Sequence, residues 1–507
     1  MSLKGPTHIS KSSNMIEKHV DTEARQVIDS AKTDKALELL ANNHIDFNPE
    51  SEEARRLLRK IDWRLMPMIF TVYLFQLMDK NSLAFAAIMG IREDANLTPS
   101  QYSWLGSIVY FGYLAGEIPA TFLMQRFPLA RYLAIMCMIW GIIVAMHAVC
   151  HDFASLAAVR FLLGFVEVCT APAVIMITAS WYTKTEQVTR VAIWYTTSGF
   201  AAVFGGFFSW CIYQATSFRW QGLFVLYGGL TLFTGIVVLL FLPASPTDAK
   251  WLTNQQKVMA LERVRSNKTG TEVWKFNAAQ LKEALLDVRF YMVFLLLASG
   301  GVANGGVTAF GPTIIKSFGF SVSQTTLLNM GSGGAQVAGT ILALFVAKKT
   351  SGTFAGVYTL VLAVVGTVMM LAMAPQHNTA RYGGFILLMQ FPIYVLFVIT
   401  FMTGGVAGST KKFAFTVAYQ FGYSVGNIVG PQTYRGSDAP NYPIAKYTML
   451  GFLVLTALMV GTYGLLHKLW NKRRDARALS EGEEPRMENE EFSDLTDFQI
   501  KSFRYPL

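Results

Sequence analysis

Four ionisable residues lie deep inside apolar stretches of this sequence, where a charge is costly and is usually kept for a function. Asp79 and Lys80 are adjacent, about fourteen residues into the first apolar run. Arg160 and Glu167 share a later run and are seven positions apart. Seven positions are two helical turns, so both side chains point the same way, about 10 Å apart along the axis.

Two acids and two bases in only two helices are suited to proton-coupled binding of an anion. A carboxylate in such surroundings can take up and release a proton, and the cations can receive an anionic group. Arg160 can hold a carboxylate with two parallel hydrogen bonds. We therefore predict that Asp79 and Glu167 carry the coupling proton and that Lys80 and Arg160 bind substrate. The alternative is that these four, together with Glu117, neutralise one another as buried ion pairs that only specify packing.

Uncharged polar residues extend this candidate site. Gln76 and Tyr73 precede Lys80 by four and seven positions, which places all three on one helical face. A second stripe, at positions i, i+4 and i+8 of a later run, consists of Tyr419, Tyr423 and Asn427. We predict both groups as substrate-binding residues.

One further acid, Glu117, lies nearer the end of its run, followed by the basic loop of Arg126 and Arg131. There a carboxylate can serve as a gate or hold parts of the structure together. We predict a gating or structural role for these three residues.

The composition indicates which elements must position these residues. Only 15% of the 507 residues are charged, 52% are hydrophobic and the mean hydropathy is +0.35. A typical soluble domain has about 25% charged residues. A soluble enzyme, a disordered chain and a fibrous protein are therefore excluded, and we expect an integral membrane protein whose partner is the lipid bilayer.

Apolar runs near the ~20 residues that cross a bilayer follow one another along the chain. We identify twelve, at 65–88, 102–124, 131–150, 154–180, 190–213, 220–242, 290–311, 325–347, 353–374, 382–402, 413–434 and 446–469. The predicted parts are a largely disordered N-terminal tail, a six-helix bundle, a central loop, a second six-helix bundle and a C-terminal tail: 1–60, 61–242, 243–289, 290–470 and 471–507.

The basic residues indicate the orientation. The net charge of +10 comes from Lys and Arg beside the apolar runs, where they set topology, and nucleic acid is not expected as a partner. Both tails and the central loop then lie in the cytosol. An all-α protein with six and six spans has the plan of the major facilitator superfamily, whose substrate sites lie near the midplane between two halves.

No pattern indicates a metal, a cofactor or an enzyme. The four cysteines, Cys137, Cys150, Cys169 and Cys211, have no Cys-x-x-Cys spacing, and we interpret them as structural thiols. The sequence has no Gly-x-Ser-x-Gly or His-Glu-x-x-His motif. We expect the driving force to be a proton gradient without any cofactor.

Several motifs resemble the fungal allantoate-permease-like transporters of the anion:cation symporter family. They are Phe75-Gln76-Leu77-Met78-Asp79-Lys80, Arg160-Phe161-Leu162-Leu163-Gly164-Phe165-Val166-Glu167, and Gly426-Asn427 with Gly430-Pro431-Gln432. The resemblance implies proton-coupled uptake of a small organic anion such as allantoate, ureidosuccinate or another carboxylate. It also implies that the proton is carried at Asp79 and Glu167 and that the carboxylate binds Lys80 and Arg160. Many relatives have Arg where this chain has Lys80.

Two other functions stay open at this point. The same fold can export or exchange a small metabolite, and a transporter-like nutrient sensor is a further alternative. For the main hypothesis, we expect a monomeric symporter in the plasma membrane.

Overall fold

The computed structural model describes residues 51–214, 218–243, 245–265, 277–481, 494–500 and 502–507. Within these residues all regular secondary structure is helical. The first half forms α2 (Glu52–Met89), α3 (Ile91–Asp94), α4 (Pro99–Arg126), α5 (Leu129–Met146), α6 (Phe153–Glu167), α7 (Thr170–Trp181), α8 (Lys184–Tyr195), α9 (Thr197–Tyr213) and α10 (Trp220–Phe241). The second half forms α13 (Val288–Lys316), α14 (Val322–Lys349), α15 (Gly352–Ala372), α16 (Asn378–Leu388), α17 (Tyr394–Gly405), α18 (Ser409–Gln432) and α19 (Pro443–Glu481). The short helices α11 (Asn254–Arg265) and α12 (Ala278–Leu286) lie between the halves.

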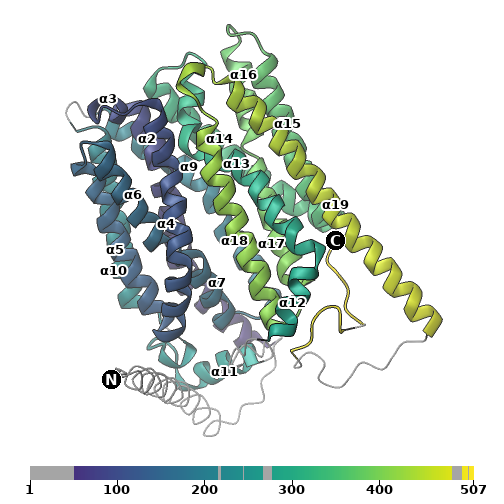
Figure 1. Ribbon diagram of the computed structural model, residues 1–507. Coiled ribbons are helices and arrows are strands. Elements are labelled where there is room, and N and C mark those ends of the chain that lie inside the picture. Colours follow the sequence, from purple (N-terminus) through teal and green to yellow (C-terminus); the bar gives the residue numbers. More distant parts are fainter. Residues whose placement is uncertain (1–50, 215–217, 244, 266–276, 482–493, 501) are drawn as a thin grey trace, which may run out of the picture.

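The long helices run side by side in two groups, the first half in purple to blue-green and the second in green to yellow (Figure 1). Ten spans among the described residues are long and apolar enough to cross a membrane. Two predicted runs, 65–88 and 413–434, fall on α2 and α18, which are not among the ten. Both are long helices of 38 and 24 residues. Their lower hydropathy has a clear source, because they carry the polar residues of the candidate site. The prediction of an all-α membrane fold is confirmed.

Three predicted runs are interrupted helices: the run 190–213 is divided into α8 and α9 without a proline, and proline accounts for the other two interruptions. The run 154–180 is divided into α6 and α7, and the run 382–402 into α16 and α17 with a 3-10 turn at Phe391–Ile393. Pro172 and Pro392 have no N–H to donate to the carbonyl four residues earlier, which breaks the helical ladder there. Glu167 is the last residue of α6 and therefore lies at one of these breaks.

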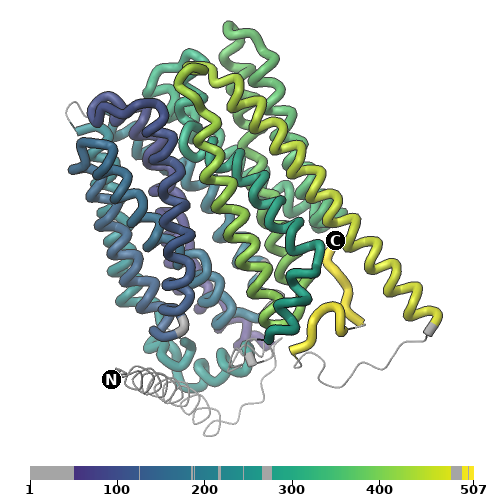
Figure 2. Tube along the Cα trace, in the orientation of Figure 1, coloured from purple at the N-terminus to yellow at the C-terminus, as the bar shows by residue number. Residues whose placement is uncertain are grey.

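The ends of the chain differ from the predicted tails. α2 begins at Glu52 rather than after residue 60, because Ser51 caps it by accepting a hydrogen bond from the Ala54 N–H at 3.2 Å. The predicted disorder of residues 1–50 lies outside the described residues. At the other end, α19 extends to Glu481, and residues 494–500 and 502–507 return to pack beside the second half (Figure 2).

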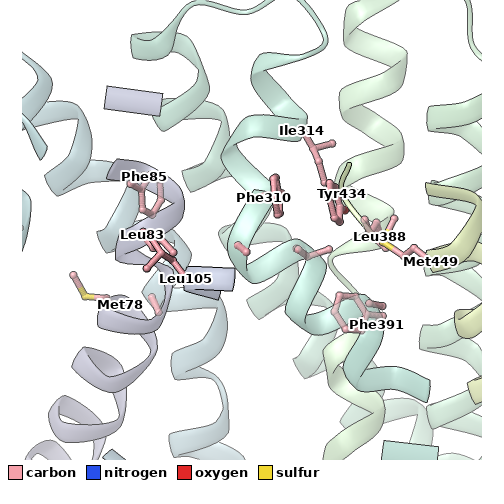
Figure 3. Close-up of a cluster of buried hydrophobic side chains, with 14 of the residues drawn as sticks. Met78, Leu83, Phe85, Leu105, Phe310, Ile314, Leu388, Phe391, Tyr434 and Met449 are labelled. Atoms are coloured by element: carbon pink, nitrogen blue, oxygen red, sulfur yellow. The ribbon is translucent and has the colours of Figure 1, made fainter. Parts of the chain in front are cut away.

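Buried apolar side chains hold each group of helices together. In the first half, Leu83 and Phe85 of α2 lie beside Leu105 of α4 (Figure 3). In the second half, the ring of Phe310 of α13 stacks on the ring of Tyr434, with ring centres 4.2 Å apart (Figure 3). α13 and α18 approach closely at Gly426, where an added Cβ would lie 2.2 Å from the Ala298 carbonyl oxygen. Only glycine permits that approach.

Hydrogen bonds join the two halves near the Pro99 end of α4. The Tyr102 hydroxyl donates to the Ala309 carbonyl at 2.7 Å, and the Ser107 hydroxyl donates to the Ile428 carbonyl at 2.7 Å. The predicted orientation places this end of α4 outside the cell. The halves are therefore closed against each other at the predicted outer end.

Candidate functional site

Lys80 lies between the two halves, inside a cage of tyrosine rings. Its Nζ is 5.1 Å from the ring centre of Tyr113, 5.6 Å from that of Tyr110 and 5.7 Å from that of Tyr423. The first two rings belong to α4 and the third to α18, so both halves contribute. Aromatic faces attract a cation without neutralising it. The ammonium is thus held in position with its charge available to an anion.

Arg160 and Glu167 lie together on α6, as their spacing predicts, and both are almost fully buried. Gly164 between them lets α6 approach α4 closely, because a Cβ there would be 1.9 Å from the Val109 carbonyl oxygen. This approach brings Tyr113 of α4 next to Glu167, and the Tyr113 hydroxyl donates a hydrogen bond to Glu167 Oε1 at 2.6 Å.

Three other polar atoms of this pair have no partner among the described residues. Among the described residues, Glu167 Oε2 and the Nε and Nη2 atoms of Arg160 make no hydrogen bond, although all three are buried. Buried polar groups are normally paired, so unpaired ones call for an explanation. The arrangement does not match the alternative of Arg160 and Glu167 as a hydrogen-bonded ion pair.

Two adjoining cavities open beside these groups. The smaller, of about 20 Å³, is lined by Lys80, Arg160, Glu167 and Tyr110, among others. The larger, of about 100 Å³, shares Lys80 and Thr308 with it. The polar lining of the larger cavity comes from both halves: Lys80, Asn81, Ser198, Thr308, Asn304, Asn329, Gln336 and Tyr423. Two cations, one acid and several amides therefore line the two adjoining cavities, which Lys80 and Thr308 share.

The wall from the second half is held by a small hydrogen-bond network. Asn304 of α13 donates through Nδ2 to the Tyr423 hydroxyl at 3.0 Å and to Asn427 Oδ1 at 2.7 Å. Asn427 in turn donates to the Tyr423 carbonyl at 2.7 Å. Tyr423 lines the larger cavity, whereas Asn427 is absent from both linings and orients Asn304 and Tyr423.

Asp79 is separated from Lys80 despite being its neighbour in sequence. Successive residues of a helix point about 100° apart, and Asp79 faces α10, where the Thr231 hydroxyl donates to Oδ2 at 3.1 Å. Asp79 is fully buried, its Oδ1 has no partner among the described residues, and neither cavity lining includes it. It is a second buried acid behind the site rather than in its wall.

The other predicted binding residues lie around the site without lining either cavity. Gln76 is buried, and its Nε2 donates to the Tyr113 hydroxyl at 3.4 Å. Tyr73 packs on Trp194 with ring centres 4.6 Å apart, and Tyr419 is a half-buried part of the apolar packing.

Of the predicted gating residues, one joins the two halves. Gln420 of α18 donates through Nε2 to Glu117 Oε2 of α4 at 3.4 Å. This contact lies toward the opposite end of α4 from Tyr102. Arg126 and Arg131 are exposed at that end.

Tyr110 and Tyr113 are among the site residues that the sequence analysis missed, together with polar residues that line the larger cavity, such as Asn81, Ser198 and Thr308. Both tyrosines are buried, both surround Lys80, and Tyr113 binds Glu167. Their spacing contained a signal, because positions 110, 113 and 117 recur at helical spacing and place both rings on the face of Glu117.

Nothing in the described part of the chain suggests a metal centre. No group of three or more His, Cys, Asp or Glu side chains there is arranged to hold a metal ion. All four cysteines are free thiols, and Cys137, Cys150 and Cys169 are buried.

Comparison with known proteins gives consistent results. Residues 69–431 match the model of the Major Facilitator Superfamily. Allantoate permease of Saccharomyces cerevisiae is 33% identical over 496 residues, which cover 94% of this chain and 91% of that protein. The thiamine pathway transporter of the same yeast is 30% identical over 488 residues, covering 94% and 91%. An uncharacterised transporter of Schizosaccharomyces pombe is 35% identical over 470 residues, covering 91% of each.

Solved structures agree in fold. A bacterial homologue of the human lysosomal transporter Spinster, in an inward-facing and unoccupied conformation, superposes with a TM-score of 0.60 at 16% identity and covers 78% of this chain and 96% of its own. A D-xylose–proton symporter gives a TM-score of 0.58 at 13% identity, with 78% and 97% covered. With the family match across most of both halves, this chain belongs to the Major Facilitator Superfamily of membrane transporters and is related to the fungal group that includes allantoate permease.

Proposed function

We propose that this transporter couples the uptake of a small organic anion to the entry of protons, with the exchanged proton on Glu167 and the substrate carboxylate on Arg160 and Lys80. The observation that carries the proposal is the set of unpartnered buried atoms at one cavity: Arg160 Nε and Nη2 and Glu167 Oε2. A substrate carboxylate gives the guanidinium the partner that the chain itself does not supply.

Charge balance couples the two ligands. With Asp79 and Glu167 ionised and Lys80 and Arg160 charged, the four groups are neutral together and attract an anion weakly. Uptake of a proton leaves a net positive charge, which a bound anion then neutralises. Each ligand therefore favours the binding of the other, as linkage requires.

The hydroxyl of Tyr113 can form a hydrogen bond with the Glu167 carboxyl group in both of its protonation states. It donates to Glu167 Oε1 in the structure, and when the carboxyl group is protonated the hydroxyl oxygen can accept a hydrogen bond from it instead. Asp79, which is held by Thr231 away from the cavities, is proposed as a second proton carrier whose charge acts on the site through space.

The amide lining supports a substrate with more than a carboxylate. Asn81, Asn329 and Gln336 line the larger cavity and offer both donors and acceptors. Ureido acids such as allantoate and ureidosuccinate match this lining, as do other small polar carboxylates. We expect a monomer in the plasma membrane, where uptake of such nutrients takes place.

Transport by the reconstituted protein tests this function. Wild-type protein in liposomes should accumulate radiolabelled allantoate, or another carboxylate selected by a binding screen, when the outside is acidic. Glu167→Gln should lose accumulation but keep counterflow of substrate, because an amide cannot release a proton. Glu93→Gln, a matched change at an exposed residue outside the central cavities, should still accumulate substrate. Full gradient-driven accumulation by Glu167→Gln would refute the coupling role.

A further inference from the structure

Two cations are buried together at the Pro443 end of the second half, away from the central cavities. Arg381 is 6% exposed and Lys446 is 2% exposed. Both lie over the ring of Phe318, with Arg381 Cζ 4.6 Å and Lys446 Nζ 5.4 Å from its centre. Because they share one ring, the two charged centres are at most about 10 Å apart.

No acid balances this pair in the described residues. Arg381 donates through Nη2 to the Asn441 side-chain oxygen at 3.3 Å, and its Nε is buried without a partner. Asp438, the acid nearest to Lys446 in sequence, accepts from Ser437 through Oδ1 at 3.2 Å, and its buried Oδ2 has no partner among the described residues, so it makes no ion pair with either cation. Burying two like charges without a counter-charge is unfavourable, and an aromatic face offsets only part of that cost.

The helical positions of the two residues make the imbalance greater. Arg381 is the fourth residue of α16, and Lys446 is the fourth residue of α19. The N-terminal end of a helix carries partial positive charge and disfavours cations. The side chain of His377, which precedes α16, makes no capping hydrogen bond. Two helix N-termini and two cations thus contribute positive charge to one region.

We propose that this region, defined by Arg381, Lys446 and Phe318, binds a phosphate group. A guanidinium with a free N–H and an ammonium form the usual side-chain pair for phosphate oxygens, and helix N-termini bind phosphate through their backbone N–H groups. The phosphate comes either from free inorganic phosphate or from the headgroup of an anionic phospholipid. Exposed Ile444 and Tyr447 flank Lys446 on α19, which suits contact with lipid.

Thermal unfolding of the purified full chain tests the proposal. One arm titrates inorganic phosphate against sodium chloride at equal ionic strength. The other adds phosphatidylglycerol or, as a control, phosphatidylcholine to the micelles. Saturable stabilisation in the phosphate arm identifies a free-anion site, and stabilisation by phosphatidylglycerol alone identifies a headgroup site. A wild-type protein that responds to neither overturns the proposal.

Variants assign the effect to this region. Arg381→Gln and Lys446→Gln should each raise the half-saturating ligand concentration at least tenfold. Lys316→Gln, which removes an exposed cation at the same end of α13, should respond as the wild type does. Arg160→Gln should also retain the response, which excludes binding at the central site. Equal responses from wild type and the Arg381 and Lys446 variants would overturn the assignment.

A second readout needs no ligand. In buffer free of phosphate and anionic lipid, Lys446→Gln should unfold at the same or a higher temperature than wild type, because it removes an uncompensated buried charge. A clear drop in unfolding temperature would mean that the chain itself satisfies Lys446, and it would overturn the proposal.

Discussion

Arg160 combines full burial with two unpartnered donor atoms, Nε and Nη2. A planar guanidinium can hold a carboxylate through two parallel hydrogen bonds, which one ammonium cannot reproduce. We therefore expect Arg160→Lys to weaken substrate binding at least tenfold, or about 1.4 kcal/mol. Isothermal titration calorimetry with the transported carboxylate measures this loss. Lys80→Arg serves as the companion variant and should bind with a smaller change. Normal affinity of a folded Arg160→Lys protein would reduce Arg160 to a packing residue.

At this scale the sequence indicates charge more reliably than orientation. Lys80, Arg160 and Glu167 are recognisable because a charge within an apolar run is rare. Tyr113 is not, because a tyrosine there is equally typical of the membrane interface or of apolar packing. The direction of Asp79 depends on how α2 is rotated against α10, which tertiary packing decides and local spacing does not.

The packing of α6 on α4 positions the acid of the site. Gly164 permits that packing, and the side chain of alanine at this position would meet the Val109 carbonyl. Gly164→Ala should force the helices apart, break the Tyr113–Glu167 hydrogen bond and destabilise the protein by about 1–3 kcal/mol. Thermal unfolding and substrate binding measure both effects. Gly229→Ala in α10, where nothing lies within 4 Å of the new methyl group, should be neutral or stabilising.

The C-terminal segment forms buried ion pairs with α13 and α18, two helices of the second half. Asp497 accepts from Arg289 Nη2 at 2.6 Å and lies 2.9 Å from Lys411 Nζ, and all three side chains are fully buried. Arg289 belongs to α13 and Lys411 to α18. Burial raises the pKa of Asp497, but Arg289 and Lys411 outweigh it and hold the pKa below its usual value. The sequence analysis treated this segment as a polar tail. The ion pairs could not be recognised from local spacing, because Asp497 is 208 positions from Arg289 and 86 positions from Lys411.

Asp497→Asn should therefore destabilise the protein by about 1–3 kcal/mol at pH 7, because Arg289 and Lys411 each lose one charge-assisted partner while keeping Asp287 and Glu283. A lowered pKa in the folded state stabilises the protein above the unfolded pKa of about 3.9, and this stabilisation is lost as the pH falls through the folded value. The difference from wild type should thus be constant from pH 7 to 5 and shrink only below about pH 4. Asp475→Asn, which breaks a more exposed pair with Arg504, should change stability little. An equal loss in both variants would contradict this account.

The two halves are joined at the predicted outer end through Tyr102 and Ser107. In this fold the halves rock against each other around a central site, so these contacts should stabilise the state that is closed outside. Tyr102→Phe with Ser107→Ala should shift the population toward the outward-open state. Thr308 lines both cavities, so Thr308→Cys reports whether reagents can reach them. Cys211→Ala is added to remove the exposed native thiol. A membrane-impermeant thiol reagent added from outside should label the introduced cysteine faster in the double variant. Unchanged labelling would mean that other contacts hold this end closed.

The account as a whole depends on proton uptake and anion binding acting on one another. Equilibrium binding of a carboxylate whose own charge is constant from pH 5 to 8, measured for wild type and Glu167→Gln, tests this most directly. Affinity of the wild type should rise as the pH falls, because proton uptake gives the site a net positive charge. Glu167→Gln, which mimics the protonated acid, should bind with an affinity that changes much less with pH. A flat profile for the wild type would contradict the account and indicate a carrier that works without protons.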